Sequence, residues 1–596
     1  MWRQAPKQNA SRPISIATRE LSLNIATSAA QTVGVSQNVA NQVMIQWSSV
    51  PDTSSYQVLV DDTPNFVTPI ASQTVSQTSL SLNIFDAGFA PGVMYYVRVN
   101  PTGSQTTFRL NVQRWSESYL SYSYARAAWN STGRAWMSQY SGIGWNEATQ
   151  SWSLNSSWSD ATTNVAQDAY FTEYMARSAV TMGSVRNDLA LLDELAAFYV
   201  AYEGRFTSVG TMRAMTQYNT SMLADSGPDS TKTLTWVWPN GSTTYVRECD
   251  LCNSQFYHPA ARLLRIITTL PSSQRTQAMQ TFASWYAPVL VHDHLLRLLW
   301  RDHGALVQQY QNTPNYISDR DLWLIAGAAE VLGANANDPN LVPLTSGENS
   351  QLHQAVQIAV QALQTNYRTY YPDTENFQGT VVGSVSYFNG ELIAQNDPDY
   401  AYSGYTGQTF PTPSDARVQP GVSWDISHFY RFPVFVRSLY DNRKATGLSF
   451  PSARDIQLVV NQLMYKTFQG NFNLPLYNSY FDGSNGWFRV GYHGPNFGYP
   501  PAQYCNNSAN GVGYTEPCLT SGAVQGWGLL AFFGADLTQL QHALTTLAWS
   551  QDPTQIEFRN QYYHYSGLYS ASDSQGQPQY PPLLFWVLSG TVERLQ

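Results

Sequence analysis

Charged residues are scarce in this chain, and the shortage excludes one class of partner. Only 12% of the 596 residues are Asp, Glu, Lys or Arg, and 41 acidic against 32 basic side chains give a net charge of −9. No run of basic residues occurs anywhere in the sequence. Proteins that bind nucleic acid present clustered basic residues to the phosphate backbone, so we expect no nucleic-acid partner.

Long apolar runs are missing as well. No apolar stretch reaches the roughly 18 residues that a membrane-spanning helix needs, so we expect no membrane span. The first residues, MWRQAPKQNAS, lack the apolar segment of a secretory signal peptide. We expect that such a signal has been removed, because the cysteine pattern favours export.

Cysteine is rare, and its spacing is informative. The four cysteines form two pairs, Cys249 with Cys252 and Cys505 with Cys518. Two local disulfides are typical of an oxidising compartment, so we expect a secreted or periplasmic protein. A four-cysteine zinc site is the alternative. The sequence has no Gly-x-Gly-x-x-Gly turn, phosphate-binding loop or nucleophile elbow, and we expect no cofactor.

Aromatic residues, in contrast, are abundant. They make up 14% of the chain, with 18 Trp and 38 Tyr, and many lie in Gly- and Asn-rich stretches. Exposed aromatic rings in such loops indicate a binding surface, and sugars offer apolar ring faces and hydroxyls that suit Trp and Tyr. Packing of the rings beneath long loops is the alternative for any one of them.

Residues 20–112 have the alternating pattern of a β domain. Polar and apolar residues alternate in NQVMIQWSSV (41–50), SSYQVLVDD (54–62), TSLSLNI (78–84) and VMYYVRVNP (93–101). A strand ending in Trp47, then SSYQVLV, then a late Tyr-x-Val-x-Val strand resembles a fibronectin type III-like domain. The resemblance implies a small β-sandwich with this tryptophan in its core.

From residue 113 onward the pattern is helical. Apolar residues recur at i, i+3, i+4 and i+7 in FTEYMARSAVTMGSV (171–185) and NDLALLDELAAFYVAYEG (187–204). Further helices are expected at 259–270, 274–291, 319–332, 351–367, 433–446, 453–468 and 537–548. Long loops separate some of them, at 206–257, 370–432 and 471–526, and loops of this length are usually functional.

Paired helices that recur through residues 113–596 predict an (α/α) toroid after the sandwich. This order of domains resembles the carbohydrate-active toroid enzymes, among them polysaccharide lyases of the heparinase II type and glycoside hydrolases with an immunoglobulin-like leader. The resemblance is architectural, covers most of the chain and includes no diagnostic family motif. It implies a multidomain enzyme with a polysaccharide or oligosaccharide substrate.

Two stretches place similar residues just before a proline. Proline is tolerated at the first position of a helix, so we expect both stretches to be loops that enter helices and face one groove. Capping of helix starts and filling of the core are the alternative. The stretch WDISHFYRFP (424–433) supplies Trp424, Asp425, His428, Tyr430 and Arg431, and CNSQFYHP (252–259) supplies Asn253, Tyr257 and His258.

A third cluster lies in FDGSNGWFRVGYHGPNFGYPP (481–501). Its five glycines permit tight turns and close approach to a ligand. We expect a sugar-binding wall here, with an ordered loop pinned by its own aromatic residues and by a Cys505–Cys518 disulfide as the alternative. The candidate residues are Asp482, Trp487, Arg489, Tyr492, His493 and Asn496.

The stretch HDHLLRLLWRDH contains three histidines that could be metal ligands: His292, His294 and His303. A pair of ligands on one helix needs i, i+4 spacing, whereas His292 and His294 are two residues apart and face different directions. We interpret these histidines as solvated or core residues and expect no metal.

Two reactions fit the clusters. A lyase for uronic-acid polymers needs a base, an acid and a group that neutralises the uronate; the candidates are Asn253, Tyr257, His258, His428, Tyr430, Arg431, Tyr492 and His493. A glycoside hydrolase needs two carboxyl groups, for which Asp425 and Asp482 are the natural pair and Glu375, Glu391 and Asp399 are in reserve.

The concentration of Tyr, His and Arg favours elimination, and we predict a secreted polysaccharide lyase. Hydrolysis by a carboxylate pair is the close alternative. A non-catalytic glycan-binding protein or adhesin is the alternative of another class.

Overall fold

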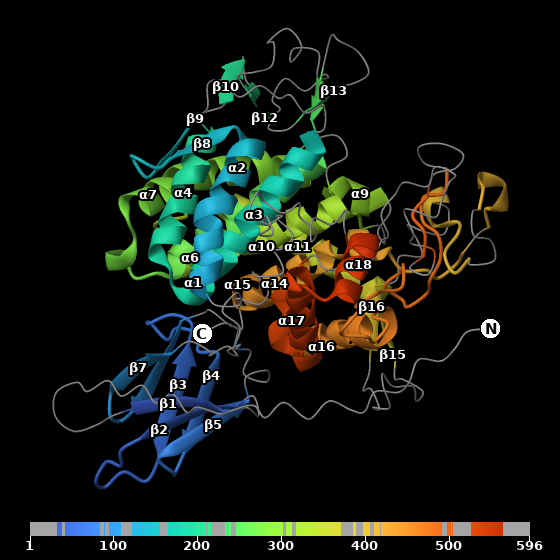
Figure 1. Cartoon of the computed structure of the whole chain (residues 1–596). Coiled ribbons are helices and arrows are strands. Elements are labelled where there is room, and N and C mark those ends of the chain that lie inside the picture. Colours follow the sequence, from blue (N-terminus) through green and yellow to red (C-terminus); the bar gives the residue numbers. More distant parts are fainter. Residues whose placement is uncertain are drawn as a thin grey trace. The chain divides into compact units, whose positions relative to one another are not determined.

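The chain folds as two compact units, formed by residues 1–89 with 94–110 and by residues 90–93 with 111–596. The computed structural model describes residues 33–38, 42–83, 89, 94–108, 122–154, 165–203, 206–209, 212–215, 233–234, 237–239, 246–248, 250–301, 306–312, 317–370, 385–388, 397–405, 411–417, 419–491, 498–501, 504 and 526–563. Figure 1 shows the whole chain coloured along the sequence.

In the first unit, the described residues form seven strands in two antiparallel sheets. The strands are β1 (Val33–Asn38), β2 (Gln42–Trp47), β3 (Tyr56–Asp61), β4 (Ala71–Val75), β5 (Ser79–Asn83), β6 (Tyr95–Asn100) and β7 (Ser104–Phe108). One sheet has the order β1-β2-β5 and the other β4-β3-β6-β7 (Figure 1).

The predicted alternation explains how this unit is packed. Tyr56, Val58 and Val60 on β3 are buried, and so is Trp47 at the end of β2. The Trp47 and Tyr56 rings meet edge to face with 5.4 Å between their centroids. The expected core position of this tryptophan is therefore confirmed.

The second unit is largely helical, as expected for the residues after the β region. Its longer helices are α3 (Val165–Arg186), α4 (Leu189–Glu203), α6 (Asp250–Thr269), α10 (Asp319–Asn337), α11 (Ser346–Asn366), α14 (Arg431–Asp441), α16 (Ala453–Gln462), α17 (Ala535–Trp549) and α18 (Pro553–Tyr562).

Shorter helical segments connect these helices. They are α1 (Tyr122–Ala128), α2 (Arg134–Ser141), α7 (Gln277–Thr281), α8 (Ala287–Val289), α9 (Leu306–Asn312), α13 (Ile426–Phe429) and α15 (Arg443–Thr446); the π-helical η2 (Trp129–Gly133), η4 (Phe282–Tyr286), η5 (Leu290–Arg301) and η9 (Leu463–Thr467); and the 3-10 turns η3 (Ser272–Gln274), η7 (Pro398–Tyr400), η8 (Pro413–Asp415) and η12 (Trp527–Phe533).

Short strands complete the second unit. Three pairs form antiparallel ribbons: β8 (Ile143–Asn146) with β9 (Ser151–Leu154), β13 (Val237–Pro239) with β14 (Val246–Glu248), and β15 (Tyr367–Tyr370) with β16 (Val385–Phe388). The strands β10 (Phe206–Val209), β11 (Met212–Met215) and β12 (Thr233–Leu234) form a small sheet in that order.

Helix α10 lies at the centre of the helical packing. It contacts α6, α14, α11 and α15, and every residue from Asp321 to Ala334 is buried. Its start is fixed by a capping box, in which the Ser318 hydroxyl accepts from the Asp321 amide and the Asp321 carboxylate accepts from the Ser318 amide. A helix buried on all sides requires internal partners for any polar residue it carries, and Glu330 is such a residue.

Both proline-based predictions of helix starts are wrong. Helix α6 begins at Asp250, so Pro259 lies inside it and Asn253, Tyr257 and His258 are helical residues. Helix α14 begins at Arg431, two residues before Pro433, and the short helix α13 precedes it. Pro433 lies in the first turn of α14, where a proline loses no hydrogen bond, so it marks that start only to within a turn. Pro259 lies in the interior of α6, which forms there without the hydrogen bond that a proline cannot donate.

None of the helices within the described ranges combines the length and the apolar character needed to cross a bilayer.

Candidate functional site

Two clusters that are distant in sequence lie side by side, at residues 424–431 and 479–489. The Ile426 amide donates to the Ser479 carbonyl over 2.9 Å, and the Phe481 amide donates to the Trp424 carbonyl over 3.0 Å. Between these bonds, Asp425 and Tyr480 form an antiparallel bridge. This short pairing places the start of α13 against the loop that carries Phe488 and Arg489.

Asp425 caps α13 and also holds His428. Its Oδ1 accepts the backbone amides of Ser427 and His428, at 3.0 and 3.1 Å. Its Oδ2 accepts from His428 Nδ1 at 2.8 Å and from the Tyr400 hydroxyl at 3.0 Å. The local reason is helix geometry: an N-cap carboxylate reaches the amides of the first turn, and the side chain three residues on lies beside it.

The Asp425 carboxylate is ionised although it is fully buried. Burial on its own raises the pKa of Asp425, but the charge and hydrogen bond of His428 and the hydrogen bond of Ser427 bring the pKa of this carboxyl well below its usual range. A buried carboxylate at Nδ1 fixes the orientation of the imidazole and directs Nε2 away from itself.

The His428 imidazole remains accessible. The Asp425 side chain is 0% exposed, whereas the His428 side chain is 25% exposed. Its Nε2 forms no hydrogen bond with any residue that the structure describes. The ring packs edge to face against Phe488, with 5.9 Å between the centroids. This combination of an oriented ring and an accessible nitrogen is the arrangement that proton transfer requires.

Arg489 follows Phe488 in an unusual backbone conformation. Its φ of 55° lies in the left-handed region, which a long side chain seldom adopts. Two contacts with Asp399 hold it there: the Arg489 amide donates to the Asp399 carbonyl over 3.0 Å, and Nε donates to the carboxylate over 2.8 Å. Strain of this kind often occurs at functional sites, and here it lies one residue from the ring that contacts His428.

Further carboxylates surround His428 and Arg489. Asp397 is half-buried, and burial raises the pKa of its carboxyl, while the charges of Arg489 and His428 oppose this shift. Asp319, at the start of α10, pairs with Arg431, and although burial favours the neutral form, Arg431 and His428 lower the pKa of Asp319. The site therefore contains carboxyl groups whose environments separate their pKa values.

Tyr430 and Arg431 are adjacent to this site but buried. The Tyr430 hydroxyl lies 3.1 Å from the Tyr174 hydroxyl, and burial raises the pKa of Tyr430. Arg431 is 4% exposed and engaged with Asp319. Both side chains are buried next to the site, and neither is exposed enough to contact a substrate.

Both carboxylates of the expected hydrolytic pair, Asp425 and Asp482, accept hydrogen bonds from backbone amides. Asp482 accepts from the Ser423 amide and from the Ser484 amide, each over 2.7 Å. Asp425 is buried beneath α13. Both carboxylates act as caps that hold the two clusters together.

The two tryptophans proposed as sugar platforms lie in the core. Trp424 is 3% exposed and Trp487 is 1% exposed. Trp487 packs with Tyr402 and Tyr405. Sequence alone does not separate a buried aromatic residue from an exposed one in such loops, because both occur beside glycine and asparagine.

The cluster on α6 belongs to the interior as well. Asn253 is 0%, Tyr257 2% and His258 1% exposed. His258 Nε2 lies 3.0 Å from Ser438 Oγ on α14, which donates to Glu330 on α10 over 2.7 Å. Tyr257 stacks on His294 with 3.6 Å between ring centroids. The expectation that 252–259 and 424–433 open on one groove fails for α6, since its side chains face other helices.

Two further candidate histidines, His292 and His294, lie within the described residues. His292 is 45% exposed and lies 3.1 Å from Glu348, and His294 is buried, as the interpretation of solvated and core residues expected. No group of three or more His, Cys, Asp or Glu side chains that could hold a metal ion occurs in the part of the chain that the structure describes.

Several candidate residues fall outside the described residues. They are Tyr492, His493, Asn496, Glu375, Glu391, His303, Cys249, Cys505 and Cys518, and for Cys252 only its position in α6 is described. Their predicted roles, including both disulfides, stay predictions.

The structure adds three residues that we did not single out from the sequence: Tyr400, Asp397 and Asp319. The stretch Asp397-Pro398-Asp399-Tyr400 forms η7, with Asp397 as its cap. A carboxylate before proline is a turn signal that could have drawn attention to this segment. Its proximity to His428 arises from tertiary packing.

Comparison with known proteins adds no relative from which a function could be transferred. No family model, curated protein or solved structure matches the chain.

Proposed function

We propose that this protein is a glycan-cleaving enzyme in which His428, held by Asp425, transfers protons during β-elimination from a uronic-acid-containing polysaccharide. The observation that supports this proposal is the pair itself: a buried, ionised carboxylate 2.8 Å from Nδ1 of an imidazole that is 25% exposed. Such a pair supplies a base of fixed orientation, which is what abstraction of a carbon-bound proton requires.

The chemistry assigned to His428 balances within one sugar linkage. Nε2 takes the proton from C5 of the uronate, a C4–C5 double bond forms, and the C4–O bond breaks with its electron pair on the departing oxygen. The imidazolium then returns a proton to that oxygen. Asp425 stabilises the charged ring between the two transfers and stays ionised itself.

Arg489 is the residue we assign to the uronate carboxylate. Its side chain is 25% exposed, and its backbone is held beside the Phe488 ring that contacts His428. A planar guanidinium suits a carboxylate, and neutralising that group makes the C5 proton more acidic. Asp399, which orients Arg489, is then a positioning residue.

Hydrolysis of a glycosidic bond is the second candidate, and one observation favours it. Burial raises the pKa of Asp397, so this carboxyl is suited to act as a general acid beside Asp399 and His428. In that reaction His428 would activate water rather than remove a carbon-bound proton.

We also propose the finer architecture expected from the sequence, a fibronectin type III-like sandwich followed by an (α/α) toroid. The strand orders β1-β2-β5 and β4-β3-β6-β7 support the fibronectin type III-like sandwich expected for residues 20–112. Contacts between helices such as α3 with α6 and α6 with α10 support a toroid for residues 113–596. We keep the proposal that the protein is secreted or periplasmic, which depends on the four cysteines.

The first prediction tests His428 directly. We expect His428→Ala to lower turnover of a uronic-acid polymer at least about a hundredfold, because general-base catalysis contributes about that much. The measurement is the ultraviolet absorbance of the unsaturated product together with the count of new reducing ends. Thermal unfolding of the same sample reports whether the fold is intact.

The matched control is His292→Ala, which removes an exposed histidine paired with Glu348. It should leave turnover unchanged. New reducing ends without ultraviolet absorbance would replace elimination by hydrolysis. Full turnover by folded His428→Ala would remove this residue from the proposal, and binding of the polymer without any cleavage would favour the glycan-binding alternative.

A further inference from the structure

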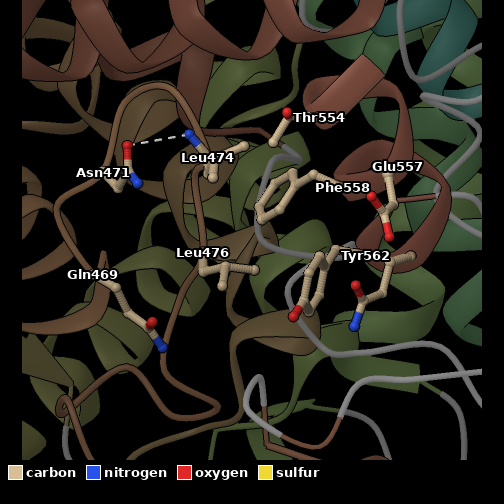
Figure 2. A pocket seen from close by; sticks show the side chains of 9 residues that line it. Gln469, Asn471, Leu474, Leu476, Thr554, Glu557, Phe558 and Tyr562 are labelled. Carbon is tan, nitrogen blue, oxygen red and sulfur yellow. Dashed lines mark hydrogen bonds between the residues drawn. The ribbon is translucent and has the colours of Figure 1, made fainter. Parts of the chain in front are cut away.

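A pocket of about 420 Å³, lined by none of the residues assigned to the His428 site, lies between the segment after η9 and helix α18. Figure 2 shows the side chains that line it. The lining residues are Gln469, Asn471, Leu474, Leu476, Thr554, Glu557, Phe558, Gln561 and Tyr562. The volume is within the range of sites for small molecules.

The shape of the pocket is fixed by bonds at its two walls. Asn471 Oδ1 accepts the Leu474 amide over 3.2 Å, which folds the segment after η9 into a turn (Figure 2). Gln555 on α18 donates to the Asn473 carbonyl over 3.2 Å, and the Tyr563 hydroxyl donates to the Pro475 carbonyl over 2.5 Å. These bonds connect the helix and the residue that follows it to the turn.

One side of the pocket is apolar and aromatic. The Phe558 and Tyr562 rings lie one helical turn apart on α18, with 4.7 Å between their centroids. Leu474 and Leu476 line the pocket from the opposite wall (Figure 2). A ligand with one apolar face would be held between the two rings and the two leucines.

The rest of the lining is hydrogen-bonding and carries a single charge. Within the described residues, the Glu557 carboxylate, the Thr554 hydroxyl, the Tyr562 hydroxyl and the Asn471 amide nitrogen make no hydrogen bond to protein. Among the lining residues that the structure describes there is no Lys or Arg, and Glu557 is the only acid. An anionic ligand would be repelled, whereas a neutral ligand with several hydroxyls would find both donors and acceptors.

We propose that this pocket binds a neutral sugar ring, with the apolar face of the pyranose against Phe558 and Tyr562 and its hydroxyls on Glu557, Thr554 and Asn471. The ligand class follows from the pocket's own chemistry and does not depend on the reaction assigned to His428. The pocket would then anchor a glycan chain at neutral residues, separately from the place where it is cleaved.

The experiment titrates the full chain carrying His428→Ala with cellobiose, maltose and lactose, followed by calorimetry and by saturation-transfer NMR. A diuronate and the diamine putrescine are titrated in parallel. We expect at least one neutral disaccharide to bind and its ring C–H protons to receive the transferred signal. The diuronate should bind at this pocket at least about tenfold more weakly, since Glu557 opposes its charge.

Two variants and a control locate the binding. We expect Tyr562→Ala to weaken the affinity about tenfold, which corresponds to about 1.4 kcal/mol and is the size of one aromatic contact. Glu557→Gln should weaken it as well, and Glu147→Gln, which changes an exposed carboxylate in the turn between β8 and β9, should not.

Absence of binding by all three neutral disaccharides would overturn the proposal. Affinity that is unchanged in a folded Tyr562→Ala variant, or binding of putrescine alone, would overturn it too. Because binding is measured in a chain without His428, a negative result here is distinct from a failure of the proposed reaction.

Discussion

The imidazole of His258 illustrates how one buried residue affects acid stability. It is 1% exposed, and burial together with the charges of Arg262, Arg177 and Arg265 lowers the pKa of His258 well below its usual value. Its Nε2 bonds with Ser438, which in turn bonds with Glu330. The folded protein therefore keeps this ring neutral at a pH where the unfolded chain protonates it.

The sign of the pH effect follows from this difference. Above about pH 6.5, the pKa of the unfolded histidine, the ring is neutral in both states and the free energy of unfolding is unaffected by its titration. Below that pH the unfolded chain binds a proton that the folded protein does not, so the free energy of unfolding falls by up to about 1.4 kcal/mol per pH unit. We expect the difference in unfolding free energy between the wild type and His258→Gln to shrink by about 2 kcal/mol from about pH 7 to about pH 5. Urea unfolding at both pH values measures it.

His292→Gln is the control for this prediction, because that side chain is 45% exposed. A constant difference between wild type and His258→Gln at the two pH values would contradict the role assigned to the buried ring. The sequence singled out His258 for its neighbours, but its burial depends on α10 and α14.

At the scale of the elements, close approach of helices depends on one glycine in α10. A Cβ at Gly333 would lie 2.8 Å from Asn442 Cγ and 2.9 Å from Arg265 Cδ, both of which are part of the Glu330 network. A Cβ at Gly347, in the first turn of α11, would meet nothing closer than 4.0 Å.

These two glycines predict opposite effects of the same substitution. We expect Gly333→Ala to lower the free energy of unfolding by about 3 kcal/mol through overpacking and loss of the Asn442–Glu330 bond. Gly347→Ala should raise it by about 0.5 kcal/mol, since alanine restricts the unfolded chain. Chemical denaturation measures the change in unfolding free energy of each variant. Equal changes in the two variants would argue against this packing of α6, α10 and α14.

At the scale of the whole molecule, the division into two units predicts that the first unit folds on its own. We expect residues 20–112, produced alone, to fold cooperatively with about 5 kcal/mol of stability. Trp47 is the only tryptophan of this fragment, and it is buried. Its fluorescence should shift to longer wavelength in one transition on adding urea.

Emission of an exposed tryptophan in buffer alone would contradict independent folding of this unit. The complementary test is turnover by residues 111–596. We assign the chemistry to that unit, so its activity per folded molecule should equal that of the full chain.

The sequence determined the elements whose pattern is periodic. The alternation around Tyr56, Val58 and Val60 predicted β3, and the apolar spacing of 319–332 predicted α10, because burial of one face is a local requirement. It also placed Asp425 and His428 in one candidate stretch, but as members of alternative mechanisms, and the helix start that brings their side chains together is known only from the structure.

Tertiary structure alone decided which of these residues reach solvent. Trp424 and Trp487 entered the core, and Asp482 became a cap for Ser423, 59 residues away. Asp399 came to hold Arg489 across 90 residues. Burial and long-range hydrogen bonds depend on which surfaces the packed elements cover, and a pattern of residue types along the chain does not contain that information.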